Sequence, residues 1–355
     1  MVFDYIDGGA EDEHSLRGNE DAFARHRFIH RVLRDVSAPD PSICLFGKRR
    51  DLPFFLSPTA GNRLFQTQGE IAVARAAGAA GIACGLSTLG STSIEDFAAS
   101  GVGPKWFQTY VWKDRGLTRD MLLRAKAAGF EALLVTVDLP VHGHRERDHR
   151  NGFAIPPKIG PKQVWHALRA PRWTIDYLAG PPIRYANLAH DTAAMSLAAF
   201  VGQQLDPSFA WDDAAALIAD WDGPTILKGV VHPDDAVRAK DIGFTAVAVS
   251  NHGGRQLDRD IAPLDALPAI RDAVSAAYPL LIDGGIRRGS DILTALMLGA
   301  NAVGIGRSYL YGLAAGGEAG VARAIEILRS ELLRSMALMG LPSLIQPTET
   351  AFESD

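Results

Sequence analysis

Short apolar runs alternate with amphipathic stretches along most of the chain from Pro53 onward. The apolar runs are continuous, which indicates strands that are buried on both faces, as in a parallel sheet. The expected strands are Phe54–Leu56, Ile82–Cys84, Trp106–Val111, Ala132–Val137, Thr225–Leu227, Ala246–Ser250, Leu280–Asp283 and Ala302–Ile305. The helices expected to follow them are Glu70–Ala79, Ser93–Ala99, Thr118–Ala128, Trp211–Asp220, Asp234–Ile242, Leu264–Ala276, Ser290–Leu298 and Gly320–Met339.

Eight strand–helix units over roughly 250 residues match the size and order of an α/β TIM barrel, the (β/α)8 fold. We therefore predict a single barrel domain that spans residues 1–355. An open, doubly wound sheet of the Rossmann type is the alternative, because its strands and helices alternate in the same way. No Gly-x-Gly-x-x-Gly pattern follows the first expected strand, so the sequence does not support a nicotinamide site.

One long insertion interrupts this pattern, since residues 139–210 separate the fourth strand from its helix. Connections of this length are unusual in a compact domain and are often functional. The insertion is either a lid or subunit contact, which its modest number of basic residues favours, or a membrane contact through residues 158–180. The membrane alternative rests on basic residues interleaved with Trp, Tyr and Leu. These basic residues are Lys158, Lys162, Arg169 and Arg172.

The composition narrows the class of protein and its partners. Apolar residues make up 47% of the chain, enough to build a folded core, and a formal net charge of −5 gives no basic footprint for nucleic acid. The sequence contains neither a transmembrane stretch nor a recognisable signal peptide. Its two cysteines, Cys44 and Cys84, suit neither a disulfide framework nor a metal-binding motif. We expect a cytoplasmic protein without a metal site.

Each expected strand is followed by polar or glycine-rich residues. Catalytic groups of a TIM barrel lie at the carboxyl ends of its strands, and a purely structural barrel does not need polar residues at all of them. The sequence therefore predicts a large polar ligand, and chemistry, at this face. The segments are Ser57–Ala60, Ser87–Thr88, Gln108–Tyr110, Thr136–Asp138, Lys228–Gly229, Ser250–Arg255, Asp283–Arg287 and Gly304–Arg307.

The segments after the seventh and eighth strands have the composition of a phosphate site. Asp283–Gly289 and Gly304–Arg307 each combine glycines with arginine and lead into a helix. Glycines let backbone N–H groups approach an anion, and these two loops form the usual phosphate site of TIM barrels. We therefore expect a ligand that carries a phosphate.

The segment after the sixth strand combines a base with a carboxylate-binding group. His252 lies beside glycines and Arg255 follows it; an imidazole suits proton abstraction near neutral pH, and a guanidinium captures a carboxylate. Asp138 either orients His252 or caps a turn. Lys228 needs negative charge nearby, for which a flavin, a phosphate and a Schiff-base intermediate are all open. The pattern predicts proton removal next to a carboxylate.

The segment Ser250–Asp258, SNHGGRQLD, resembles the active-site signature of the FMN-dependent α-hydroxy-acid dehydrogenase and oxidase family. The resemblance covers nearly the whole chain and is strongest to the mandelate dehydrogenase branch of that family. It implies a TIM barrel that holds FMN and oxidises an (S)-2-hydroxy acid to the 2-oxo acid. The segments that resemble this branch are Gly143–Asp148, Pro171–Trp173 and Asp206–Trp211.

The resemblance also implies roles for individual residues. It makes His252 the base and Asp138 its partner, with Tyr110 near the substrate hydroxyl. It makes Tyr5, Arg145 and Arg255 the ligands of the substrate carboxylate. Among the residues implied to contact FMN, Lys228 stabilises negative charge on the flavin. These residues are Pro58, Thr59, Ala60, Ser87, Gln108, Thr136, Lys228, Ser250, Asp283, Gly285, Arg287, Gly306 and Arg307.

The substrate, the acceptor and the proton that His252 removes stay open. Leu89 stands where some relatives have tryptophan, which favours an apolar pocket for a medium or aromatic side chain such as that of mandelate. Electrons pass either to a quinone or another membrane acceptor, from an enzyme on the inner face of the cytoplasmic membrane, or to O2 in a soluble oxidase that releases peroxide. The base takes either the hydroxyl proton or the α-carbon proton.

Three further expectations follow from the sequence. A non-redox isomerase or aldolase barrel is the remaining alternative, with Lys228 forming a Schiff base. Relatives suggest a homotetramer. A helix precedes the position of Met1 in relatives, which suggests that the start of this chain is truncated or misassigned.

Overall fold

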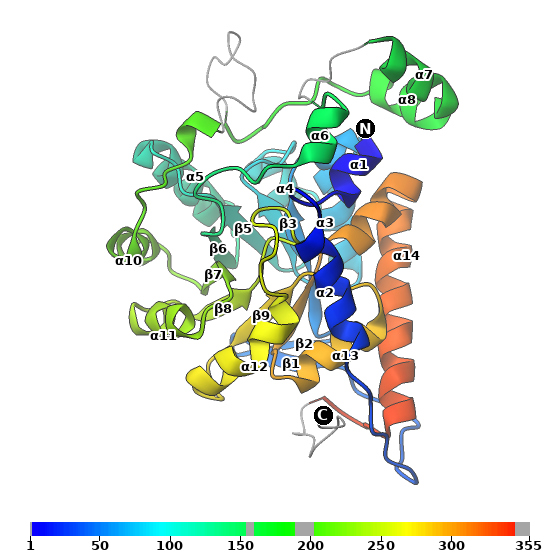
Figure 1. Ribbon diagram of the computed structural model, residues 1–355, viewed down its shortest axis with the longest axis vertical. Helices are drawn as coiled ribbons and strands as arrows, with labels where there is room; N and C mark the ends of the chain where they lie inside the picture. Colours follow the sequence, from blue (N-terminus) through cyan, green and yellow to red (C-terminus); the bar gives the residue numbers. More distant parts are fainter. Residues whose placement is uncertain (1, 154–159, 189–201, 345–355) are drawn as a thin grey trace.

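The computed structural model describes residues 2–153, 160–188 and 202–344 (Figure 1). At its centre, eight parallel strands form a closed barrel in chain order, and β10 pairs with β3 through Val303 and Phe54 to complete the ring. This confirms the predicted TIM barrel and excludes the open sheet. The strands are β3 (Phe54–Thr59), β4 (Cys84–Ser87), β5 (Lys105–Thr109), β6 (Ala132–Thr136), β7 (Thr225–Val230), β8 (Ala246–Val249), β9 (Leu280–Asp283) and β10 (Ala302–Ile305).

An outer ring of helices covers the barrel, as Figure 1 shows. Several begin at residues that the sequence marks clearly: Ser93 and Asp114 accept hydrogen bonds from backbone N–H groups in the first turn, and Pro233 and Pro263 stand at the first helical position. The helices are α3 (Gly69–Ala79), α4 (Ile94–Ala99), α5 (Arg115–Ala127), α10 (Trp211–Ala219), α11 (Pro233–Asp241), α12 (Pro263–Ala273), α13 (Gly289–Met297) and α14 (Arg307–Met339).

The last helix differs most from its expected bounds. We expected it to begin at Gly320, whereas α14 begins at Arg307, directly after β10. Gly316 and Gly317 leave helical geometry inside it, and Gly317 has a φ of 59°, a conformation that glycine adopts at little cost. The expected helix is therefore the second part of α14, and the glycines that interrupt it obscured the first part.

Two strands extend beyond the apolar runs from which they were predicted. The strand β4 ends at Ser87, which pairs with Gln108 of β5, rather than at Cys84. The strand β7 ends at Val230 rather than at Leu227, and its Lys228 pairs with Thr136 of β6. Parallel pairing thus continues into polar residues at the carboxyl ends, where an apolar run no longer marks the strand.

The barrel interior is packed at the end opposite to the polar loops. Phe55, Trp106, Leu134, Ile226 and Leu281 are all buried there in one cluster. The hairpin of β1 (Ile43–Leu45) and β2 (Lys48–Arg50) adds Leu45 to this cluster. One end of the barrel is therefore filled, and the end with the polar loops is left to form a site.

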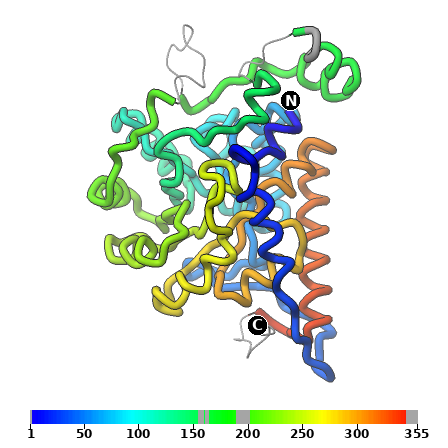
Figure 2. Tube along the Cα trace, in the orientation of Figure 1, coloured from blue at the N-terminus to red at the C-terminus, as the bar shows by residue number. Residues whose placement is uncertain are grey.

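Two parts of the chain lie outside the barrel and its ring. The N-terminal helices α1 (Val2–Asp7) and α2 (His14–Ala24), which the sequence pattern did not predict, run along the barrel from the face with the polar loops (Figure 2). The insertion forms α6 (Glu146–Arg150), α7 (Pro161–Arg169) and α8 (Pro171–Ala179), and α7 and α8 project from the body of the protein (Figure 1). Within the described ranges, no helix is long and apolar enough to cross a bilayer.

Candidate active site

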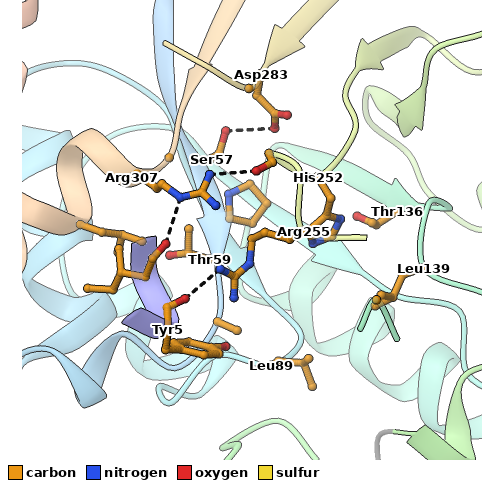
Figure 3. A pocket seen from close by; sticks show the side chains of 18 of the residues that line it. Tyr5, Ser57, Thr59, Leu89, Thr136, Leu139, His252, Arg255, Asp283 and Arg307 are labelled. Carbon is orange, nitrogen blue, oxygen red and sulfur yellow. Dashed lines mark hydrogen bonds between the residues drawn. The ribbon is translucent and has the colours of Figure 1, made fainter. Parts of the chain in front are cut away.

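The carboxyl ends of the strands surround one cavity of about 420 Å3 (Figure 3). Most of the residues predicted for the site line it together. Ser87, Asp138 and Ser250 are set behind this lining, and each bonds a residue that belongs to it. The predicted residues in the lining are Tyr5, Pro58, Thr59, Ala60, Gln108, Tyr110, Thr136, Arg145, Lys228, His252, Arg255, Asp283, Gly285, Arg287, Gly306 and Arg307.

His252 and Asp138 form a hydrogen-bonded pair at the cavity wall. The Nδ1 atom of His252 lies 2.9 Å from Asp138 Oδ1, which leaves its Nε2 atom for a ligand. Burial opposes the charge on Asp138, but the charge of His252 and its hydrogen bond, together with Lys228, lower the pKa of the carboxyl below its usual value. The aspartate is therefore held as a carboxylate that orients the imidazole and stabilises its protonated form.

Local backbone geometry makes room for this pair. His252 has a φ of 58°, a left-handed conformation that is uncommon for a residue other than glycine and is often found at functional sites. Gly229 has a φ of 105°, and a Cβ atom there would lie 2.6 Å from the side chain of Asp138. Gly229 near the end of β7 thus leaves room for the side chain of Asp138.

The N-terminal segment bonds two arginines, the half-buried Arg255 and the buried Arg307. Arg255 donates from Nη1 to the carbonyl oxygens of Tyr5 and Gly8, at 2.8 and 2.9 Å, and Figure 3 shows the first of these contacts. Arg307 donates to the carbonyls of Ile6, Gly8 and Gly253. The sequence pattern gave no signal for these bonds, because the acceptors are backbone atoms.

The guanidinium groups make the cavity attractive to anions. Burial, and then repulsion from Arg145, lower the pKa of Arg255 to about 9. An anionic ligand between Arg145 and Arg255 would relieve this repulsion. Arg287 and Arg307 also line the cavity. Each guanidinium makes some hydrogen bonds within the protein, and the guanidinium of Arg287 bonds the carboxylate of Glu20.

Lys228 lies in a buried polar cluster with Asp283 and Ser250. Its Nζ atom lies 2.9 Å from Asp283 Oδ2 and 2.7 Å from Ser250 Oγ. Burial disfavours the ammonium, but the charges of Asp283 and Asp138 raise the pKa of Lys228 above its usual value. A Schiff base needs a neutral amine, so this environment argues against an aldolase-type role for Lys228.

The cavity fits FMN, a flat ring system with a polar edge and a chain that ends in phosphate. Ser87 donates to Gln108 at 2.8 Å, and Gln108 donates to Thr136 at 3.0 Å, so three neighbouring strands present a fixed polar edge. At the opposite side, a Cβ atom added to Gly306 would meet no atom within 4 Å. Its backbone is therefore open to the cavity, as phosphate binding requires.

Several lining residues were not predicted. Phe65, Phe153, Tyr185 and His142 all line the cavity, and Leu89, expected to make the pocket apolar, lines it too. Enclosure in the pocket, and then the charges of Arg145 and His252, lower the pKa of His142. Phe153 and Tyr185 come from the insertion, far from any strand end, so no motif marked them.

A polar cavity at the carboxyl end of a TIM barrel, with a His–Asp pair, an anion site and a polar edge, defines a barrel enzyme that uses a phosphate-bearing cofactor. The sequence model of the family described as FMN-dependent dehydrogenase matches residues 1–353, so the chain belongs to that family. The protein is thus an oxidoreductase whose cofactor is FMN.

Named relatives and a solved structure agree with this family. The L-lactate dehydrogenase of Caulobacter vibrioides is 44% identical over 355 residues, which cover 99% of this chain and 92% of the relative. The L-lactate oxidase of Nostoc sp. is 45% identical, over 99% of this chain and 93% of the relative. The crystal structure of the monotopic membrane protein (S)-mandelate dehydrogenase superimposes with a TM-score of 0.95 at 39% identity, over 100% of this chain and 95% of that one. Lactate and mandelate are both 2-hydroxy acids.

Proposed function

We propose that the protein oxidises an (S)-2-hydroxy acid to the 2-oxo acid, with His252 as the base. The observation that carries this proposal is the His252–Asp138 pair, in the cavity that also holds Arg145 and Arg255. FMN, when bound, accepts the two electrons that leave the substrate. The protein supplies the groups that bind, orient and deprotonate the acid.

The residues divide this work between binding and proton transfer. Arg255 and Arg145, with Tyr5, bind the carboxylate, because guanidinium groups match its two oxygens. The carboxylate then fixes the α-carbon and its hydroxyl near the Nε2 atom of His252. His252 accepts the proton, and Asp138 stabilises the imidazolium that forms.

The side-chain end of the cavity supports a medium or aromatic substrate, such as mandelate. Leu89 and Phe65 are buried apolar residues in its lining, and Phe153 stacks on Tyr5 with ring centroids 4.3 Å apart. Such surfaces bind a phenyl group or an alkyl chain by excluding water.

We propose that electrons leave to a membrane acceptor and that the hairpin of α7 and α8 contacts an anionic membrane surface. This hairpin exposes apolar side chains, and its exposed Arg169 and Arg172 suit anionic headgroups. The similar (S)-mandelate dehydrogenase is described as a monotopic membrane protein, which supports the proposal. Lys158 lies outside the described residues. The exposed apolar side chains are Val164, Trp165, Leu168, Ile175 and Leu178.

A soluble oxidase that passes electrons to O2 is the second candidate, because a relative of equal similarity is named L-lactate oxidase. Stopped-flow reoxidation separates the two candidates. Rapid reoxidation of the reduced protein by O2, with peroxide release, would favour the oxidase, whereas slow reoxidation by O2 and rapid reoxidation by a quinone would favour the membrane dehydrogenase.

The reaction itself is tested by mixing the protein with glycolate, lactate, 2-hydroxyoctanoate and mandelate without oxygen. We expect the (S)-acids with medium or aromatic side chains to bleach the flavin fastest. A flavin that none of these acids bleaches would contradict the proposed reaction. Light scattering of the purified protein tests the predicted homotetramer.

A further inference from the structure

The cavity contains a hydrogen-bond donor that the proposed reaction does not use. Tyr185 is half-buried, lines the cavity and packs against the core, and its hydroxyl makes no hydrogen bond within the described residues. It lies close enough to Tyr5, Tyr110 and Arg145 for electrostatic interaction. A polar group in such surroundings costs free energy unless a ligand or water bonds it.

The protein fixes the position of Tyr185 firmly. The next residue, Ala186, donates its N–H to the carbonyl of Gly90 at 3.1 Å. Asn187, which is 2% exposed, accepts from the N–H of Ile94 at 2.9 Å and donates to the carbonyl of Thr92 at 3.2 Å. These bonds attach the two residues that follow Tyr185 to the loop after β4 and to the first turn of α4.

The loop after β4 is itself anchored by a buried carboxylate. Glu70 of α3 accepts hydrogen bonds from the N–H and hydroxyl of Ser91, at 2.8 and 2.7 Å, and from the hydroxyl of Thr92 at 2.9 Å. The hydroxyl of Tyr185 is therefore presented by a rigid support and not by a free loop, which is the arrangement that selective recognition needs.

The carboxylate and hydroxyl of the substrate do not need the Tyr185 hydroxyl as a hydrogen-bond donor. A 2-hydroxy acid offers a carboxylate and one hydroxyl at that end. The proposed function already assigns these oxygens to Tyr5, Arg145 and Arg255, with Tyr110 and His252 at the hydroxyl. Burial, and then the neighbouring Tyr5 and Tyr110, raise the pKa of Tyr185, so its hydroxyl stays protonated and can donate.

We propose that Tyr185 is a specificity-determining residue that donates a hydrogen bond to an oxygen on the substrate side chain. The preferred substrates are then 2-hydroxy acids whose side chain carries a hydroxyl group, bound between apolar walls that include Leu89 and Phe65. This inference rests on the proposed function and adds the substrate class to it.

Matched pairs of acids test the inference, each pair differing by one side-chain hydroxyl. The pairs are lactate and glycerate, mandelate and 4-hydroxymandelate, and 3-phenyllactate and 3-(4-hydroxyphenyl)lactate. In at least one pair we expect a kcat/KM roughly tenfold higher for the hydroxylated acid, the usual effect of one neutral hydrogen bond. In Tyr185→Phe this ratio should fall to about one. Tyr177→Phe removes the same atom from α8, where Tyr177 stacks on Trp173, and should keep the ratio.

Binding gives a second readout that does not depend on turnover. Titration of the flavin absorbance with the matched 2-oxo acids should show the same preference in affinity, and Tyr185→Phe should lose it. No preference in any pair, or a preference that survives in Tyr185→Phe, would overturn the inference. If none of these acids bleaches the flavin, the proposed reaction has failed; if both members of every pair bleach it equally well, only the inference about Tyr185 has failed.

Discussion

The barrel strands and the insertion contribute to the same cavity in different ways. Polar side chains at the strand ends bond one another, as Lys228 bonds Asp283 and Gln108 bonds Thr136. The insertion presents groups with few protein hydrogen bonds: the guanidinium of Arg145 has contacts of 3.4 and 3.5 Å, and the hydroxyl of Tyr185 makes no hydrogen bond in the described part of the chain. Groups fixed in advance suit a cofactor and a reaction that do not change, whereas donors with few protein bonds stay available to the substrate, Arg145 to its carboxylate and Tyr185 to its side chain.

We expect the largest effect from replacing the proposed base, His252, in the loop after β8. His252→Ala should keep FMN but lose roughly 10³-fold or more in the rate of flavin reduction, because it removes the imidazole that Asp138 orients and stabilises when protonated. Anaerobic stopped-flow measurement of flavin absorbance reports both the bound FMN and the rate. Near-normal reduction by any 2-hydroxy acid would show that His252 is not the base.

The partner of the base should have the next largest effect. Asp138→Asn keeps the size of the side chain but removes the charge that stabilises the imidazolium, so we expect a loss of roughly 10²-fold in kcat. Asp234→Asn, on the exposed start of α11, is the matched control. An equal loss in both variants would mean that the effect is general and not due to the pair.

We expect a smaller effect from Arg255, which we propose binds the substrate carboxylate together with Arg145 of the insertion. Arg255→Lys should raise KM roughly tenfold and change kcat less, because an ammonium cannot contact both carboxylate oxygens as a guanidinium does. Steady-state kinetics with a good substrate separates the two constants. A large fall in kcat with an unchanged KM would instead place Arg255 in the chemical step.

We expect the smallest effect on turnover from substitutions in α7 and α8, the helices of the insertion that project from the body of the protein. The double variant Leu168→Ser and Ile175→Ser should weaken binding to vesicles of anionic lipid and leave turnover with a soluble dye nearly unchanged, since both side chains are about 70% exposed on α7 and α8. Val102→Ser, an equally exposed apolar residue elsewhere, is the control for a general effect on solubility. Vesicle binding that the double variant retains would exclude the hairpin as the contact.

The sequence predicted the barrel and most of the cavity for a physical reason. Buried parallel strands give continuous apolar runs, and a TIM barrel brings all their carboxyl ends to one face. Residues as distant as Thr59 and Gly306 could therefore be placed together without a structure. The strand bounds were less accurate, because Ser87 and Lys228 continue the pairing with polar side chains beyond the apolar runs.

Two contributions could not be predicted in this way. The backbone carbonyls that bond Arg255 and Arg307 come from residues 5–8, and any sequence there supplies carbonyls. Tyr185 reaches the cavity only through the tertiary bonds of Asn187 to the loop after β4. Such contacts depend on how distant segments pack, and periodicity along the chain carries no information about them.

The bonds of the N-terminal segment also bear on how the holoenzyme assembles. Arg255 bonds Gly8 across 247 positions of sequence, and Arg307 bonds Ile6 across 301. Contacts between such distant residues carry a loop-closure cost, and so does the pairing of Val303 with Phe54 that closes the barrel. Bound FMN should offset part of this cost, because the cavity it fills is lined by both the barrel and the N-terminal segment. A purification tag is better placed at the C-terminus than directly before this segment.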